Sequence, residues 1–152
     1  GLLYIREEWL EKLWPTVVSG SWNDHKLKAA RFMNIGTNNR AIMEGLVAGL
    51  RFGKSIGYER VFGRIHQLAK NVCERARKVP YMEVVTPDDD RMYGSLSNLR
   101  FKKDPKPLWA LCDKRKIWIT HGDTGMRFST HIHTRPRDID IFFETVTEAL
   151  GS

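Results

Sequence analysis

Hydrophobic residues recur at helical spacing in two long segments of the second half of the chain. Residues 58–80 repeat apolar side chains at the i, i+3, i+4 spacing of a helix that buries one face. The segment 135–150 does the same, which predicts a closing helix. The apolar stripe of the first helix consists of Val61, Phe62, Ile65, Leu68, Ala69, Val72, Cys73 and Ala76, and that of the closing helix of Ile139, Phe142, Phe143, Val146 and Leu150.

The segment 39–56 has a different pattern. Its apolar residues cover most of the helical circumference, so we expect a helix buried on several sides; they are Ile42, Met43, Leu46, Val47 and Leu50. Asn38 or Asn39 can cap its start, and Gly57 ends it. Gly45 and Gly49 lie four residues apart and leave a smooth strip that another backbone can approach.

Shorter patterns complete the prediction. We expect strands at 1–5, 81–85, 92–101, 116–120 and 126–132, and short helices at 6–14 and 105–116, while residues 15–38 look irregular. After the long helices the order is β-β-α-β-β-α, and adjacent strands joined by a tight turn are antiparallel. The sequence therefore predicts an α+β fold, with a small, mainly antiparallel sheet and helices packed on one face.

Composition is consistent with a globular protein. Of 152 residues, 41% are hydrophobic and 28% charged, and no run approaches the roughly 20 apolar residues of a membrane helix. The two cysteines, Cys73 and Cys112, lack metal or redox spacing, which fits reduced thiols in a cytoplasmic protein. The net charge of +7 allows nucleic-acid binding, but acidic residues interrupt the basic ones. We expect neither a nucleic-acid nor a membrane partner.

The stretch "MRFSTHIH" combines an arginine with two histidines. Along one extended strand, Arg127, Ser129, His131 and His133 would share a face, which fits a metal site, a nucleic-acid patch or a site for a small anion. A metal would need a third ligand. That ligand could be His121, Asp123 or Cys112, but no spacing signature supports one, and we expect no metal site.

The stretch "NIGTNN" precedes the helix at residue 39. A glycine and a threonine before a helix offer N–H groups and a hydroxyl, which suits a phosphate, although helix capping alone explains the same residues. The chain has no P-loop, nucleophile elbow or paired-carboxylate signature. Residue patterns alone thus lead to an α+β domain with a candidate phosphate contact and an arginine-histidine strand.

Three stretches in order, "GLLYIREEWLEKLWP", "ARFMNIGTNNRAIMEGLVAGLRFGKSIGYERV" and "RFSTHIHTRPRDIDIFFETV", resemble the C-terminal part of class V aminotransferase-fold enzymes. These enzymes depend on pyridoxal 5′-phosphate (PLP), and within them the chain looks most like the isopenicillin N epimerase-like branch. The resemblance implies that residues 1–38 belong to the large domain and the interdomain connection. Residues 39–152 would form the C-terminal small domain.

The same resemblance implies roles for individual residues. Gly36 and Thr37 occupy the position at which the threonine reaches the cofactor phosphate of the other subunit of a homodimer. Arg127 occupies the position of the arginine that binds the α-carboxylate of an amino-acid substrate, and His131 matches a residue type that recurs there.

The chain also departs from the family pattern. The lysine that holds the cofactor, and the aspartate that pairs with its ring nitrogen, belong to a part of the family that this chain does not match, so we expect no catalytic residue here. Cysteine desulfurases carry a longer loop with a catalytic cysteine where this chain has only "HGDTG", residues 121–125. The resemblance implies an epimerase or aminotransferase that is inactive as this fragment. The alternative is a stand-alone basic α+β module that binds nucleic acid or a protein partner.

Overall fold

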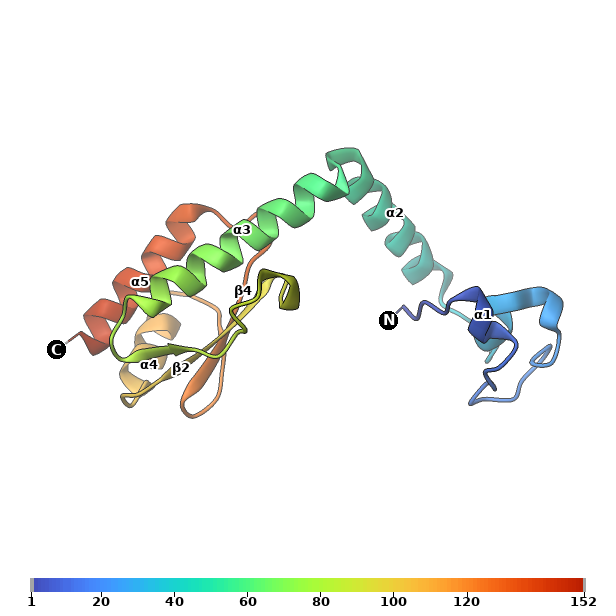
Figure 1. Cartoon of the computed structure of the whole chain (residues 1–152), viewed down its shortest axis with the longest axis horizontal. Helices are drawn as coiled ribbons and strands as arrows, with labels where there is room; N and C mark the ends of the chain where they lie inside the picture. The colour runs from blue at the N-terminus through green and yellow to red at the C-terminus, as the bar shows by residue number, and fades with distance from the viewer. Residues whose placement is uncertain (1, 152) are drawn as a thin grey trace. The chain divides into compact units, whose positions relative to one another are not determined.

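The structure is a computed structural model that describes residues 2–151. The chain divides into two compact units, residues 1–49 and 50–152, which are described separately. Figure 1 follows the elements along the chain. The assignment of residues 1–38 and 39–152 to two domains of an enzyme stays a prediction.

The first unit has little regular structure. It contains α1 (Glu7–Leu10), the 3₁₀ helix η1 (His25–Phe32) and the first part of α2 (Arg40–Ile56). The strand predicted at 1–5 is wrong for residues 2–5, which form no strand, and residue 1 lies outside the described residues. A short apolar run forms a strand only when a partner strand supplies hydrogen bonds, and this unit has none among its described residues.

Arg31 holds the first unit together. Its side chain is buried, and its guanidinium donates to the carbonyl oxygens of Leu10 (2.5 Å), Leu13 (2.9 Å) and Trp22 (3.1 Å). The same guanidinium lies 4.3 Å from the ring centre of Phe32. One charged group therefore satisfies the carbonyl groups where α1 ends and ties them to η1, a role that the sequence did not indicate.

Helix α2 corrects one prediction. Asn39 caps it as expected, because its side-chain oxygen accepts from the Ile42 N–H at 3.3 Å. However, α2 has no buried residue, whereas the sequence predicted burial on several sides. In the first unit Ile42 and Leu46 line an apolar cavity of about 510 Å³ together with Phe32, so these side chains face an open space instead of a packed core.

The second unit contains a four-stranded antiparallel sheet. Its strands are β1 (Met82–Val84), β2 (Leu96–Phe101), β3 (Thr120–His121) and β4 (Gly125–Ser129), in the spatial order β1-β2-β4-β3. In the register of the central pair, Asn98 lies opposite Arg127. On the other side of β4, Thr120 lies opposite Arg127.

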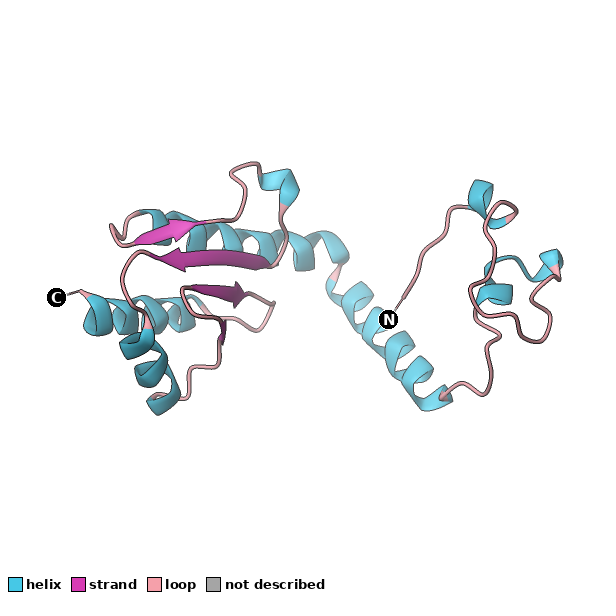
Figure 2. Ribbon diagram, turned by 90° about the horizontal axis from the view of Figure 1, so that it is seen from below, coloured by secondary structure: helices cyan, strands magenta, loops and turns pink. Residues whose placement is uncertain are grey.

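Three helices cover one face of this sheet, namely α3 (Tyr58–Arg77), α4 (Lys106–Lys114) and α5 (Pro136–Leu150), as Figure 2 shows. Along β2, Ser97, Leu99 and Phe101 are buried against the helices, while the alternate residues are exposed. The predicted stripe of α5 is entirely buried, and most of the α3 stripe is buried as well, although Phe62 is exposed. The α+β prediction, with a small antiparallel sheet and helices on one face, is confirmed.

The strands are shorter than the sequence predicted. The third strand, expected at 116–120, covers only Thr120–His121, because residues 117–119 are not paired with β4. The fourth, expected at 126–132, ends at Ser129. No helix among residues 2–151 is long and apolar enough to cross a membrane.

The acidic run at residues 88–90 takes part in ion pairs. Asp88 pairs with Arg77, Asp89 with Arg91 (2.7 Å) and Asp90 with Lys70 (2.8 Å). The hydrogen bond from Lys70 lowers the pKa of Asp90. Burial, followed by the hydrogen bond that it donates to Asp90, raises the pKa of Tyr93 to about 12. Each aspartate thus has a cationic partner within the chain.

Candidate functional site

The face of the sheet opposite the helices carries two arginines with different surroundings. Arg100 on β2 pairs with Glu83 on β1 at 3.6 Å. Arg127 on β4 is exposed and is flanked by Asn98 and Thr120, its partners in the sheet register. Within residues 2–151 no carboxylate forms an ion pair with Arg127, so its guanidinium is available to an anion from outside this unit.

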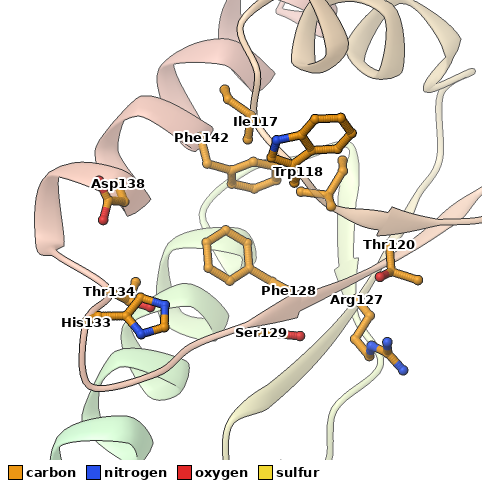
Figure 3. Close-up of a pocket in the computed structure, with 11 residues that line it drawn as sticks. Ile117, Trp118, Thr120, Arg127, Phe128, Ser129, His133, Thr134, Asp138 and Phe142 are labelled. Atoms are coloured by element: carbon orange, nitrogen blue, oxygen red, sulfur yellow. The ribbon is translucent and has the colours of Figure 1, made fainter.

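A cavity of about 380 Å³ adjoins Arg127 at the edge of the sheet. β3 begins only at Thr120, so within residues 2–151 no β3 residue pairs with Phe128 and Ser129, and the cavity lies beside this unpaired part of β4. Arg127 and Phe128 leave β4 in opposite directions, as expected for successive strand residues (Figure 3). The cavity therefore has a charged, polar side at Arg127 and an apolar side at Phe128 and Phe142.

The histidines do not share the strand face of Arg127, which corrects the prediction that all four residues do. Arg127 and Ser129 are exposed on β4, and the buried Thr130 continues the alternation, with its hydroxyl 3.1 Å from the carbonyl oxygens of Ile65 and Ser95. The strand ends because the chain then turns at residues 131–134, where the Thr134 N–H donates to the His131 carbonyl oxygen at 2.9 Å. His131 and His133 follow in a turn, with their Nδ1 atoms 3.1 Å apart.

This distance is that of a hydrogen bond, in which one ring nitrogen donates and the other accepts. In the described part of the chain, no group of three or more His, Cys, Asp or Glu residues could hold a metal ion.

Gly36 and Thr37 lie in the first unit, just before α2. Gly36 has φ +143°, a value that side-chain-bearing residues rarely adopt, and a Cβ added there would meet no atom within 4 Å. Thr37 is exposed, three residues before the first residue of α2. The backbone at this point is therefore open to a ligand. Arg127 belongs to the other unit.

Both cysteines are buried, and neither lies in the loop between β3 and β4. Cys112 on α4 is 1% exposed, and burial raises the pKa of its thiol to about 11. Cys73 on α3 is also 1% exposed, with its sulfur 3.5 Å from the Ser97 hydroxyl oxygen. Because both thiols are buried, neither is placed to attack a substrate.

The pKa of Cys112 leads to a pH-dependent stability. The folded chain holds this proton more tightly than the unfolded chain, so the stabilisation is fully present below about pH 9 and is lost as the pH rises toward 11. Two pH units correspond to roughly 2–3 kcal/mol. Denaturant unfolding from pH 8 to 11 should show this extra loss in the wild type and not in Cys112→Ala. Parallel curves for the two proteins would contradict it.

Two residues at or near the site escaped prediction from the sequence. Trp118, which lines the cavity, lies in a segment that looked like an ordinary strand. The available signal was alternation, since Trp118 and Thr120 are two residues apart, but the strand that it implied begins only at Thr120. Asn98, beside Arg127, is identifiable only from the register of β2 and β4.

Comparison with solved structures places this α+β arrangement in a known class. A cysteine desulfurase from Thermococcus onnurineus NA1 superposes with a TM-score of 0.77 and 23% identity, covering 98% of this chain and 42% of that chain. A NifS-like protein from Rickettsia africae ESF-5 superposes with a TM-score of 0.64 and 18% identity, covering 91% of this chain and 40% of that one. A C-DES mutant with glycine covalently linked to its PLP cofactor superposes with a TM-score of 0.69 and 15% identity, covering 93% of this chain and 40% of that chain. The chain thus has the fold of part of a fold type I PLP enzyme and spans about two fifths of the length of these structures.

The sequence model of the Aminotransferase class-V family matches residues 1–142. The chain therefore belongs to the class-V aminotransferase family. A search of curated proteins returned no match.

Proposed function

We propose that this chain is the C-terminal part of a PLP-dependent enzyme that acts on an amino acid, as an epimerase or aminotransferase of the isopenicillin N epimerase-like branch. The observation that carries the proposal is Arg127, an exposed arginine beside a cavity on the open sheet face with no ion-pair partner in the described residues. The enzyme would be a cytoplasmic homodimer.

Arg127 would bind the substrate carboxylate. A guanidinium and a carboxylate form two parallel hydrogen bonds in one plane, which fixes the orientation of the group as well as its position. Arg100 is unsuited to this role because Glu83 already pairs with it. With the carboxylate held at Arg127, the α-carbon and its side chain point away from the guanidinium in a fixed direction.

Gly36 and Thr37 fit a contact with the phosphate of PLP. The open backbone at Gly36 lets an anion approach, the exposed Thr37 hydroxyl can donate a hydrogen bond, and the nearby start of α2 carries positive potential. When bound, PLP acts as the electron sink for reactions at the α-carbon, while the protein orients the substrate and so selects the bond that breaks.

Desulfurase chemistry is not proposed, although two of the similar structures are a cysteine desulfurase and a NifS-like protein. That similarity concerns the fold at 23% identity or less. The loop between β3 and β4 has the sequence Gly-Asp-Thr at 122–124 and offers no thiol. The buried Cys112 has its pKa raised to about 11, which keeps the thiol protonated at neutral pH.

The proposal is tested by covalent trapping of the cofactor. The chain of residues 1–152 is incubated with PLP, reduced with borohydride and weighed by mass spectrometry, in parallel with the full-length protein. We expect a stoichiometric pyridoxyl adduct only in the full-length protein, on a lysine outside residues 1–152, because none of the lysines here lies in a cofactor-binding motif. A stoichiometric adduct on one lysine of this chain would contradict the proposal.

The contact made by Thr37 is expected to cross the subunit interface. Losing a hydrogen bond to a charged phosphate should weaken cofactor binding by roughly 1.5–3 kcal/mol. In a heterodimer, one subunit carries Thr37→Ala and the other lacks the cofactor lysine. The intact lysine site then receives a wild-type Thr37 from the opposite subunit, so its PLP affinity, measured by absorbance titration, should be normal. Weak binding there would place the contact within one subunit.

A further inference from the structure

Trp118 is the most exposed large hydrophobic side chain among residues 2–151. It is 88% exposed, although it follows the half-buried Ile117 and precedes the half-buried Ile119, which both pack against the core of the second unit. A single exposed apolar residue is ordinary. Trp118 differs in lining the same cavity as Arg127.

The backbone places Trp118 and Arg127 on the same edge of the sheet. Thr120 lies opposite Arg127 in the register of β3 and β4, and Trp118 precedes Thr120 by two residues. Residues 117–119 form no strand, and their burial alternates, with Trp118 exposed between two half-buried residues. Figure 3 shows Trp118, Thr120 and Arg127 around the cavity.

The chemistry of the cavity is divided between its two sides. Arg127, with the Thr120 and Ser129 hydroxyl groups nearby, suits a carboxylate, while Trp118 and Phe128 offer aromatic surface. Its volume of about 380 Å³ lies at the lower end of the roughly 300–1,000 Å³ range of small-molecule sites. This arrangement fits a small molecule that carries a carboxylate a few bonds away from an apolar group.

We propose that Trp118 contacts the substrate side chain, and that the substrate is an amino acid with an apolar, preferentially aromatic, side chain. This inference rests on the proposed function, because it takes Arg127 as the carboxylate anchor that sets the position of the side chain. Trp118 is then a specificity-determining residue that discriminates between amino acids by the surface they offer to its indole ring.

Non-reacting carboxylates test the inference without relying on turnover. Dissociation constants of propionate and 3-phenylpropionate are measured by calorimetry with the full-length enzyme and its variants. We expect 3-phenylpropionate to bind about tenfold more tightly than propionate, since an aromatic contact contributes up to about 1.5 kcal/mol and about 1.4 kcal/mol is a factor of ten. The ratio should fall to about 1–2 in Trp118→Ala and largely persist in Trp118→Phe.

The Arg127→Ala variant separates the two claims. If both carboxylates bind more weakly in Arg127→Ala but the wild type shows no preference for the aromatic one, the carboxylate site stands and the inference about Trp118 is wrong. The inference is equally wrong if the preference persists in Trp118→Ala. If Arg127→Ala leaves both affinities unchanged, Arg127 is not the anchor, and the proposed function loses its main support together with the inference.

Discussion

In the full-length enzyme, Arg127→Ala should lower kcat/KM for an amino-acid substrate by roughly 30- to several-thousand-fold. Truncating one member of a partly enclosed, hydrogen-bonded charge pair costs roughly 2–5 kcal/mol, and every 1.4 kcal/mol is about a factor of ten. Arg127→Lys should lower kcat/KM less, because lysine keeps the positive charge. It should still lower kcat/KM, because lysine cannot form two parallel hydrogen bonds. Steady-state kinetics provide the measurement.

Two controls make this result specific. PLP occupancy and thermal unfolding of Arg127→Ala should match the wild type, because Arg127 is exposed and has no ion-pair partner among residues 2–151. Arg100→Ala removes an arginine from the same open face and breaks only an exposed pair with Glu83, so its kcat/KM should stay near the wild-type value. Near-normal kcat/KM in Arg127→Ala would place the carboxylate anchor elsewhere.

Arg31→Ala should unfold or loosen the first unit while leaving the second unit intact. The substitution removes the three hydrogen bonds that the guanidinium donates to the carbonyl oxygens of Leu10, Leu13 and Trp22. Hydrogen bonds to a charged group contribute roughly 1.5–3 kcal/mol each, so the combined loss should be about 4.5 kcal/mol or more. Hydrogen exchange followed by mass spectrometry measures the local stability of each unit separately.

Arg6→Ala is the matched control in the same unit. Arg6 pairs with Glu8 at 3.4 Å, and both side chains are more than 60% exposed. Loss of this ion pair should therefore change the protection from hydrogen exchange little. Arg31→Lys should recover only part of the protection, because an ammonium group cannot reach three carbonyls in the fork geometry of a guanidinium. Unchanged exchange in residues 7–32 of Arg31→Ala would show that Arg31 does not hold this unit together.

Predictions of secondary structure and burial from the sequence were most accurate for elements that could be recognised by their own periodicity. The apolar stripe of α5 is buried as expected, because it repeats every three to four residues and packs on a sheet of the same unit. Helix α2 has an equally apolar sequence but no buried residue. Periodicity reports which side chains gain by burial and does not report what surface lies opposite them.

The candidate site was predicted less completely, for a similar reason. Sequence and family resemblance identified Arg127, Gly36 and Thr37, and the alternation along β4 placed Arg127 and Ser129 on one exposed face, as the structure has them. The same alternation was wrong for His131 and His133. Alternation holds only in extended backbone, and the turn at residues 131–134, which contains both histidines, ends it.

By itself the sequence determined the α+β class, the long helices α3 and α5, and the arginine at the start of the closing motif. Only the tertiary structure decided that Arg127 has no acidic partner among the described residues, that β3 begins only at Thr120, and that a cavity opens there beside Trp118. The physical reason is that a helical stripe or a strand alternation depends on near neighbours in the chain. Pairing, register and the end of a strand depend on residues far away in the sequence, which meet only after the chain has folded.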